Sequence, residues 1–150
     1  YEKSSRLIYR VYLWLGFAGM TKTEAVGLRV SDISLKQCMA RSGGRWYTIY
    51  ALAIPDVKRA CELTEFERNV RFGVATFARA DGDLILRGRK TKREITPDGY
   101  IRETLRPTVQ LGFKNAGHPG LSFDRIRKSG LFYTMLQREV LGIEGRIRGR

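Results

Sequence analysis

The sequence is poor in the residue types that cross-link small domains or hold metal ions. Its 150 residues include only two cysteines, one histidine and four prolines. A structural zinc site needs about four nitrogen or sulfur ligands, so we expect no metal site, and we expect no cofactor. Cys38 and Cys61 are far apart in sequence and fit a reducing compartment better than a disulfide. We therefore expect an intracellular protein of the cytoplasm, nucleoid, nucleus or an organelle.

Long hydrophobic runs are also missing. No apolar stretch approaches the roughly 20 residues that a membrane span requires, so we expect no membrane association. Hydrophobic residues make up 43% of the chain and aromatic residues 11%, which excludes general disorder. The length favours one domain. We assign it to residues 1–142, followed by a basic tail over residues 143–150 that begins like a protease-cleavage linker.

Acidic residues are scarce relative to basic ones. The chain has 28 Lys and Arg against 15 Asp and Glu, a net charge of +13 and a pI near 10.3. A folded chain this basic favours binding to a polyanion or an anionic surface. Charge alone does not separate DNA from RNA, because both carry the same backbone phosphates.

The first half of the chain predicts helices around a small hairpin. Apolar spacing predicts a largely buried helix over residues 6–17, ended by Gly19. Thr21 and Glu24 have the spacing of a capping box, which predicts a short helix through Leu28. Residues 36–41 and 45–54 flank a Ser-Gly-Gly turn and predict a β-hairpin. A further helix is expected from Pro55.

The second half predicts further helices. Apolar residues every four positions predict an amphipathic helix over residues 64–79, with a cap at Thr64. An extended run at 84–86 and a basic loop at 87–93 follow. Thr96 caps the next predicted helix, which Pro107 kinks or divides. Ser122 caps the last helix. Its predicted apolar side comprises Phe123, Ile126, Tyr133, Leu136 and Val140. The fold class is mainly α with a small antiparallel β-hairpin or sheet.

Residues 18–33 (AGMTKTEAVGLRVSDI) carry a resemblance to a known family. Gly19, Glu24, Leu28, Asp32 and Ile33 fall in register with a box reading T-G-L-R-x-S-E-L-x-x-L-x-W-x-D-I. The segment thereby resembles the first conserved box of the tyrosine recombinases, the phage-integrase family. The resemblance implies a tyrosine-recombinase catalytic-domain-like fold and binding to duplex DNA.

A second box of that family reads H-x-x-R at the start of a helix. Residues 124–127 resemble a degenerate copy of it. Arg127 then matches the family's second catalytic arginine, which binds the scissile phosphate, and Asp124 replaces the histidine. His118 lies too early to take that place and is expected to be a loop residue.

The departures from the family pattern concern its catalytic groups. Thr21 stands where the family has its first phosphate-binding arginine. The hairpin turn offers Arg41 and Arg45 in place of a lysine, and arginine gives up a proton poorly. The chain contains no convincing nucleophilic tyrosine, because Tyr133 lies too close to Arg127. The resemblance therefore implies a DNA-binding domain that lacks the full catalytic set.

Two other functions remain open at this point. In the first, the chain is a fragment of an active site-specific recombinase or integrase that is missing its nucleophile helix. Such an enzyme would cut DNA through a phosphotyrosine intermediate. In the second, the chain is a basic structural subunit of a ribonucleoprotein such as a mitochondrial ribosome. The expected partner is duplex DNA, with RNA as an alternative and a homo-oligomer on DNA as a further option. The residues expected to contact nucleic acid are Lys22, Arg41, Arg45, Arg87, Arg89, Lys90, Lys92, Arg93, Arg127 and Lys128.

These candidates also have structural interpretations. Thr21 is expected to act mainly as a helix cap. Arg127 could equally be an exposed arginine of the last helix. Trp46, Tyr47 and Tyr50 are expected to pack in the core and hairpin, with base stacking as the alternative.

Overall fold

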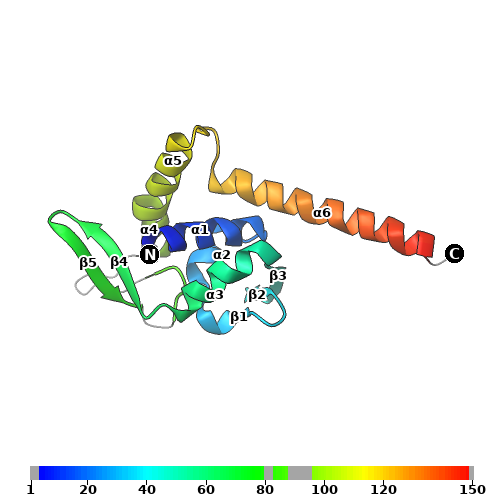
Figure 1. The fold of residues 1–150 in the computed structure, drawn as a ribbon, viewed down its shortest axis with the longest axis horizontal. Helices are drawn as coiled ribbons and strands as arrows, with labels where there is room; N and C mark the ends of the chain where they lie inside the picture. The colour runs from blue at the N-terminus through cyan, green and yellow to red at the C-terminus, as the bar shows by residue number, and fades with distance from the viewer. Residues whose placement is uncertain (1–3, 80–82, 88–95, 149–150) are drawn as a thin grey trace.

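The computed structural model describes residues 4–79, 83–87 and 96–148. The described chain is mainly helical and contains small antiparallel sheets, as the sequence predicts (Figure 1). The helices are α1 (Ser4–Phe17), α2 (Lys22–Gly27), α3 (Ile54–Glu62), α4 (Pro97–Tyr100), a π-helical stretch (Ile101–Leu105), α5 (Arg106–Asn115) and α6 (Phe123–Arg148), with 3₁₀ turns at Val30–Asp32 and Ala51–Ala53. The strands are β1 (Ile33–Ser34), β2 (Met39–Ser42), β3 (Arg45–Thr48), β4 (Glu65–Val70) and β5 (Gly73–Ala78).

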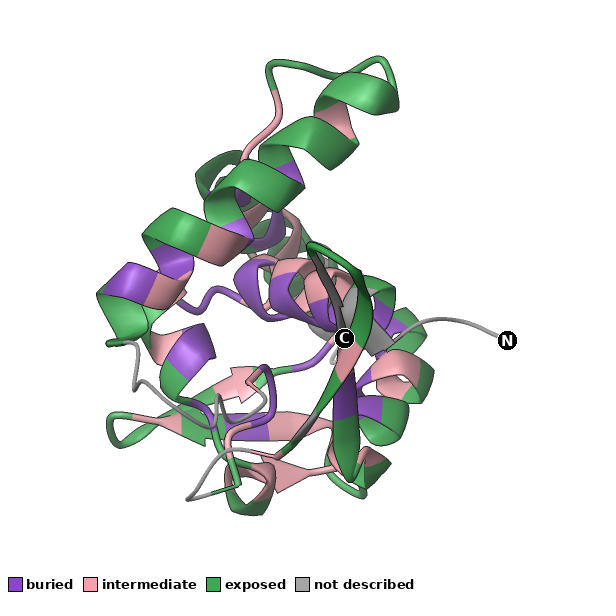
Figure 2. Ribbon diagram, turned by 90° about the vertical axis from the view of Figure 1, so that its left-hand side faces the viewer, coloured by how far each residue is buried: buried purple, intermediate pink, exposed green. Residues whose placement is uncertain are grey.

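Helix α1 is the centre of the core. Its apolar side is fully buried at Val11 and Leu15, because α2, α3 and α6 all pack on it. The buried residues, purple in Figure 2, lie on the inward sides of the elements, and exposed residues, green, cover the outward surfaces. The predicted helix over residues 6–17 is therefore confirmed. No helix in the described ranges is both long enough and apolar enough to cross a bilayer.

The predicted capping box and hairpin are both confirmed. The Glu24 N–H donates to the Thr21 hydroxyl at 3.2 Å, and the Thr21 N–H donates to a Glu24 carboxylate oxygen at 3.0 Å. Strands β2 and β3 pair antiparallel, with β1 on the other side of β2. Gly43 and Gly44 form the turn at φ of +56° and +77°, a conformation that favours glycine. The strands are shorter than predicted.

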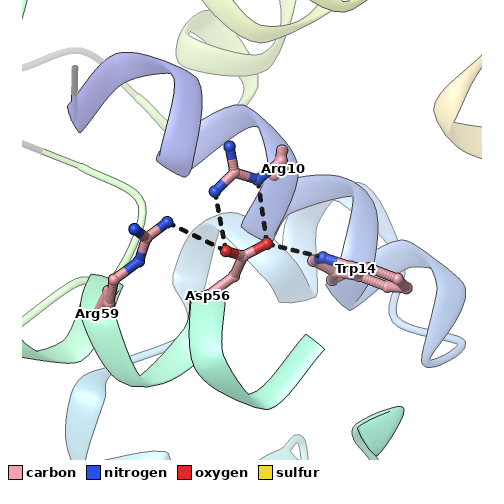
Figure 3. A network of polar contacts seen from close by, with 4 residues as sticks. All are labelled: Arg10, Trp14, Asp56 and Arg59. Atoms are coloured by element: carbon pink, nitrogen blue, oxygen red, sulfur yellow. Dashed lines mark hydrogen bonds and ion pairs between the residues drawn. The ribbon is translucent and has the colours of Figure 1, made fainter. Parts of the chain in front are cut away.

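An acidic side chain fixes α3 against α1 (Figure 3). The Asp56 carboxylate accepts two hydrogen bonds from the Arg10 guanidinium, at 2.8 and 3.0 Å, and one from the Trp14 indole at 3.1 Å. Arg59 adds a contact of 3.3 Å from within α3. The hydrogen bonds from Arg10 lower the pKa of Asp56, and burial of the carboxylate opposes this change. The hydrogen bond from Trp14 and the positive charge of Arg59 lower the pKa further. Asp56 therefore stays ionised and joins the two helices.

The predicted amphipathic helix over residues 64–79 is wrong. Strands β4 and β5 form a hairpin there, with Phe66 opposite Phe77. A spacing of four residues is an even number, so within one strand it fits one face of the strand as readily as one side of a helix. The turn of the hairpin ends the repeat, because Phe66 pairs with Phe77 whereas Val74 pairs with Asn69 on the other face. The predicted helix cap at Thr64 is wrong for the same reason: the Thr64 carbonyl accepts a hydrogen bond from the Arg79 N–H across the hairpin base, at 3.2 Å.

Arg79 holds this hairpin to the body of the protein. Its guanidinium donates to the carbonyls of Ala60 at 2.7 Å and Leu84 at 3.1 Å, and also to that of Leu63. It also lies over the Phe66 ring, 5.3 Å from the centroid. An arginine at the end of α3 satisfies carbonyls that the helix leaves without partners. Arg79 is thus a structural residue.

Helices α4 and α5 lead to α6, which packs across α1. Thr96 caps α4 by accepting the Gly99 N–H at 3.1 Å, and Pro107 lies in the first turn of α5, where the helical pattern changes. These two predictions are confirmed. Ser122 accepts the Arg125 N–H at 3.3 Å and caps α6, also as predicted. Helix α6 continues to Arg148 and extends beyond the body of the protein in Figure 1.

The apolar side predicted for α6 is buried only at its start. Phe123 is 4% exposed, whereas Leu136 is 45% and Val140 is 53% exposed. Leu136 and Val140 of the predicted apolar side are therefore not part of the core, because the body of the protein ends before the helix does.

Candidate nucleic-acid interface

The crossing of α6 over α1 brings together the two segments that carry the family resemblance. The Nε of Arg127 donates to the Gly19 carbonyl at 2.8 Å, across 108 positions of sequence. Gly130 permits this close crossing, since a Cβ at that position would overlap the Phe17 carbonyl. Arg127 is thus half-buried beside the first box and is not a fully exposed helix arginine.

Glu24 is the acidic centre of this cluster. The Tyr47 hydroxyl, from β3, donates to a Glu24 carboxylate oxygen at 2.6 Å. Burial opposes ionisation of Glu24, but the Tyr47 bond, the Thr21 bonds and the charge of Arg127 together lower its pKa. Burial and the bond to Glu24 raise the pKa of Tyr47, while Arg45 lowers it. Helix α2, strand β3 and helix α6 therefore meet around one carboxylate, with Arg127 close to it and Arg45 beside Tyr47.

The two residues that replace family catalytic groups have other partners. The Thr21 hydroxyl is used in the helix cap, as its structural interpretation predicts. Asp124, in the histidine place, forms an ion pair with Lys22 at 3.2 Å. Lys22 was predicted to contact nucleic acid, and this pairing offsets much of its charge. The cluster offers Arg127 and Arg45 as its principal cationic groups.

The hairpin turn presents an exposed basic and aromatic pair. The Arg41 guanidinium lies 5.7 Å from the centre of the Trp46 ring. Trp46 is 52% exposed, so it does not pack in the core, but it packs on Arg41, its partner across the hairpin, in agreement with the predicted hairpin packing. Arg45 is exposed on the same hairpin. An arginine over an indole ring is a cation–π contact that also leaves donors free for a phosphate.

The remaining predicted contacts lie elsewhere or outside the described residues. Arg87 is half-buried, and its guanidinium lies 5.8 Å from the centre of the Tyr100 ring. Lys128 is exposed beside Arg127 on α6. Arg89, Lys90, Lys92 and Arg93 lie outside the residues that the structure describes.

An aromatic cluster, which the sequence pattern did not predict as a unit, lies beside this interface. Tyr133 packs against Phe17 and Tyr50, with ring centroids 5.7 and 5.5 Å apart, and its hydroxyl accepts from Gln137 at 2.8 Å. These contacts agree with the prediction that Tyr133 belongs to the packed side of α6. His118 is exposed in the loop after α5, as predicted. Within the described ranges, no three His, Cys, Asp or Glu side chains group as metal ligands.

Comparisons with known proteins identify no relative. The chain matches no protein-family model, and no curated protein and no solved structure is significantly similar to it. The resemblance to tyrosine recombinases stays a prediction carried by residues 18–33 and 124–127. The geometry of the cluster is therefore the basis of any functional assignment.

Proposed function

We propose that this chain is a nucleic-acid-binding domain with a degenerate tyrosine-recombinase arrangement, which holds duplex DNA and does not cut it unaided. The observation that carries the proposal is the hydrogen bond from Arg127 to the Gly19 carbonyl. It joins the segments that resemble the family's two boxes. The net charge of +13 supports a polyanionic partner.

Arg127 has the chemistry to bind a phosphate. Its Nε donates to the Gly19 carbonyl, and its two terminal nitrogens form no hydrogen bond with the residues that the structure describes. Because the guanidinium is fixed at one nitrogen, less side-chain entropy is lost when the others bind. Arginine donors match phosphate oxygens in pairs, which gives stronger contacts than neutral hydrogen bonds.

Cleavage is disfavoured by the groups around Arg127. Thr21 has its hydroxyl in a helix cap, and Asp124 is paired with Lys22. Arg41 and Arg45 are poor proton donors for a leaving oxygen. Loss of one transition-state donor typically costs about 100-fold to 1000-fold in rate, so several such losses leave little catalysis. Binding survives such losses better, since it sums many phosphate contacts.

Substitution of Arg127 tests the binding proposal. We expect Arg127→Ala to weaken binding of a short DNA duplex about 10-fold to 100-fold, the effect of losing a charge-assisted contact. Fluorescence anisotropy at fixed ionic strength measures it, and thermal melts check that the variant is folded. Arg6→Ala is the matched control, because Arg6 is an exposed arginine at the end of α1 remote from the α6 crossing. Equal losses in the two variants would remove Arg127 from the interface.

Two further arms separate the competing functions. A suicide DNA duplex should give no covalent protein–DNA adduct, and an adduct would show that the chain is an active recombinase. Structured RNA should bind no more tightly than the DNA duplex at matched salt. A clear preference for RNA would instead favour the ribonucleoprotein subunit.

A further inference from the structure

A pocket of about 210 Å³ lies between the end of α1, the end of β3 and the middle of α6. Its aromatic lining consists of Phe17, Tyr50 and Tyr133. Its polar lining includes Thr48, Gln137 and Arg138. Pockets for drug-sized molecules measure about 300–1,000 Å³, so this pocket fits a single planar ring system better than a larger molecule.

The three aromatic rings of the pocket lie at the surface and are not part of the core. The centroid of the Tyr133 ring lies 5.7 Å from that of Phe17 and 5.5 Å from that of Tyr50, and all three residues are half-buried. By contrast, Tyr12 and Phe123 stack at 4.4 Å and are almost fully buried. The aromatic cluster therefore leaves ring surface at the pocket on which a planar ligand can stack.

Two side chains of α6 add polar groups beside these rings. The Gln137 Nε2 donates to the Tyr133 hydroxyl at 2.8 Å, which fixes the amide at the pocket. A side-chain amide has two N–H donors and an acceptor oxygen, so it can still form a donor–acceptor pair with the edge of a nucleobase. Arg138 is exposed and forms no hydrogen bond or ion pair with the residues that the structure describes. Its guanidinium is therefore available for a phosphate.

The pocket continues the candidate interface along α6. Phe17 and Ala18 line it and directly precede Gly19, whose carbonyl accepts from Arg127. Arg138 follows Arg127 by three helical turns, so the two lie on the same side of α6, about 16 Å apart along its axis. Each strand of a duplex advances about 3.4 Å per nucleotide, so one strand reaches from one arginine to the other within a few nucleotides.

We propose that this pocket binds an unpaired base of a DNA strand, which stacks on Tyr133 while Arg138 contacts a neighbouring phosphate. Proteins that bind single strands combine aromatic rings with cationic groups in this way. Stacking tolerates every base, because each has a π face, so we expect little sequence preference. The inference rests on the proposed function, and it adds that the preferred partner has an unpaired segment beside the duplex.

The test compares two DNA probes that have the same number of phosphates. One is a blunt duplex, and the other is a shorter duplex with a single-stranded thymine overhang. In fluorescence anisotropy at fixed ionic strength, the wild-type protein should bind the overhang probe about tenfold more tightly, the effect of stacking one base. Tyr133→Leu keeps an apolar side chain against Phe17 and should abolish this preference. Phe132→Leu changes the neighbouring aromatic residue, which is exposed and outside the pocket lining, and should keep it.

Two exposed positions make the test independent of folding. Arg138→Gln and Gln137→Ala change side chains at the surface, so both variants should fold like the wild type. Each should reduce the preference for the overhang probe about threefold to tenfold, the effect of one lost hydrogen-bonding group.

The two probes also separate this inference from the proposed function. Equal binding of both probes by the wild type, or a preference that persists in Tyr133→Leu, would overturn the base pocket, while binding of the blunt duplex would still support the proposed function. Failure of the wild type to bind either probe would contradict both.

Discussion

Helix α6 has two parts whose similar sequence patterns have different structural outcomes. In the inner half, residues 123–130, Phe123 is buried and Arg127 reaches Gly19. In the outer half, residues 131–140, Phe132 is 63% exposed and Met135 is 62% exposed. A helical apolar pattern shows which side of a helix can be buried. Burial also requires a neighbouring element, and α1 ends at Phe17.

The inner half of α6 therefore contributes to the stability of the fold, whereas much of the outer half lies beyond the body of the protein. The inner half shares the core with α1 and carries Arg127. The outer half contributes Tyr133 to an aromatic cluster and then leaves the body of the protein. Substitutions of the same kind in the two halves should therefore have very different effects on stability.

The largest expected effect comes from matched phenylalanines. Phe123→Ala should lower the free energy of unfolding by about 3–5 kcal/mol, since it removes a buried ring and leaves a cavity against Tyr12. Phe132→Ala should change it by no more than about 0.5 kcal/mol, because the side chain is exposed. Urea unfolding followed by circular dichroism measures both. Similar losses would show that the outer half is buried against something.

A smaller effect is expected from two helical glycines. Gly130→Ala should destabilise by about 3 kcal/mol, at the upper end for overpacking, because its Cβ would meet the Phe17 backbone. Gly112→Ala, in α5, meets no atom within 4 Å and should be neutral or stabilise by about 0.5–1 kcal/mol. Thermal melts of the two variants provide the comparison. A harmless Gly130→Ala would show that α6 does not cross α1 this closely.

The ion pair between Arg10 of α1 and Asp56 of α3 should make the stability of the protein depend on pH. Asp56→Asn should cost about 1.5–3 kcal/mol at neutral pH, because it weakens hydrogen bonds to a charged group. The folded-state pKa of Asp56 is lowered, so this stability is present above its unfolded pKa and is lost as the pH falls through the folded value. The difference between wild type and variant should thus shrink below about pH 3.9. A difference independent of pH would contradict an ionic role.

The sequence predicted the elements whose signals are local. Thr21, Ser122 and the paired glycines of the first hairpin act through neighbouring residues, and each gave the expected cap or turn. The second hairpin was missed because Phe66 and its partners repeat at a spacing that fits both strand and helix. The positive φ of Gly73, +136°, marks the turn, but a single glycine does not specify it in the sequence.

The candidate site was predicted in part. The motif match singled out residues 18–33 and Arg127, and in the structure Arg127 donates to the Gly19 carbonyl. The Lys22–Asp124 pair and the Tyr47–Glu24 bond were missed, since each depends on how helices and strands cross.

The salt dependence of duplex binding tests the central claim most directly, namely that Arg127 contacts a DNA phosphate. Wild-type affinity should fall at least about tenfold between about 50 and 200 mM salt. In Arg127→Ala the slope of log affinity against log salt should be shallower by about 0.9, the contribution of one phosphate contact, and in Arg6→Ala it should match the wild type. Affinity that does not change with salt, or equal slopes in the wild type and Arg127→Ala, would contradict the account.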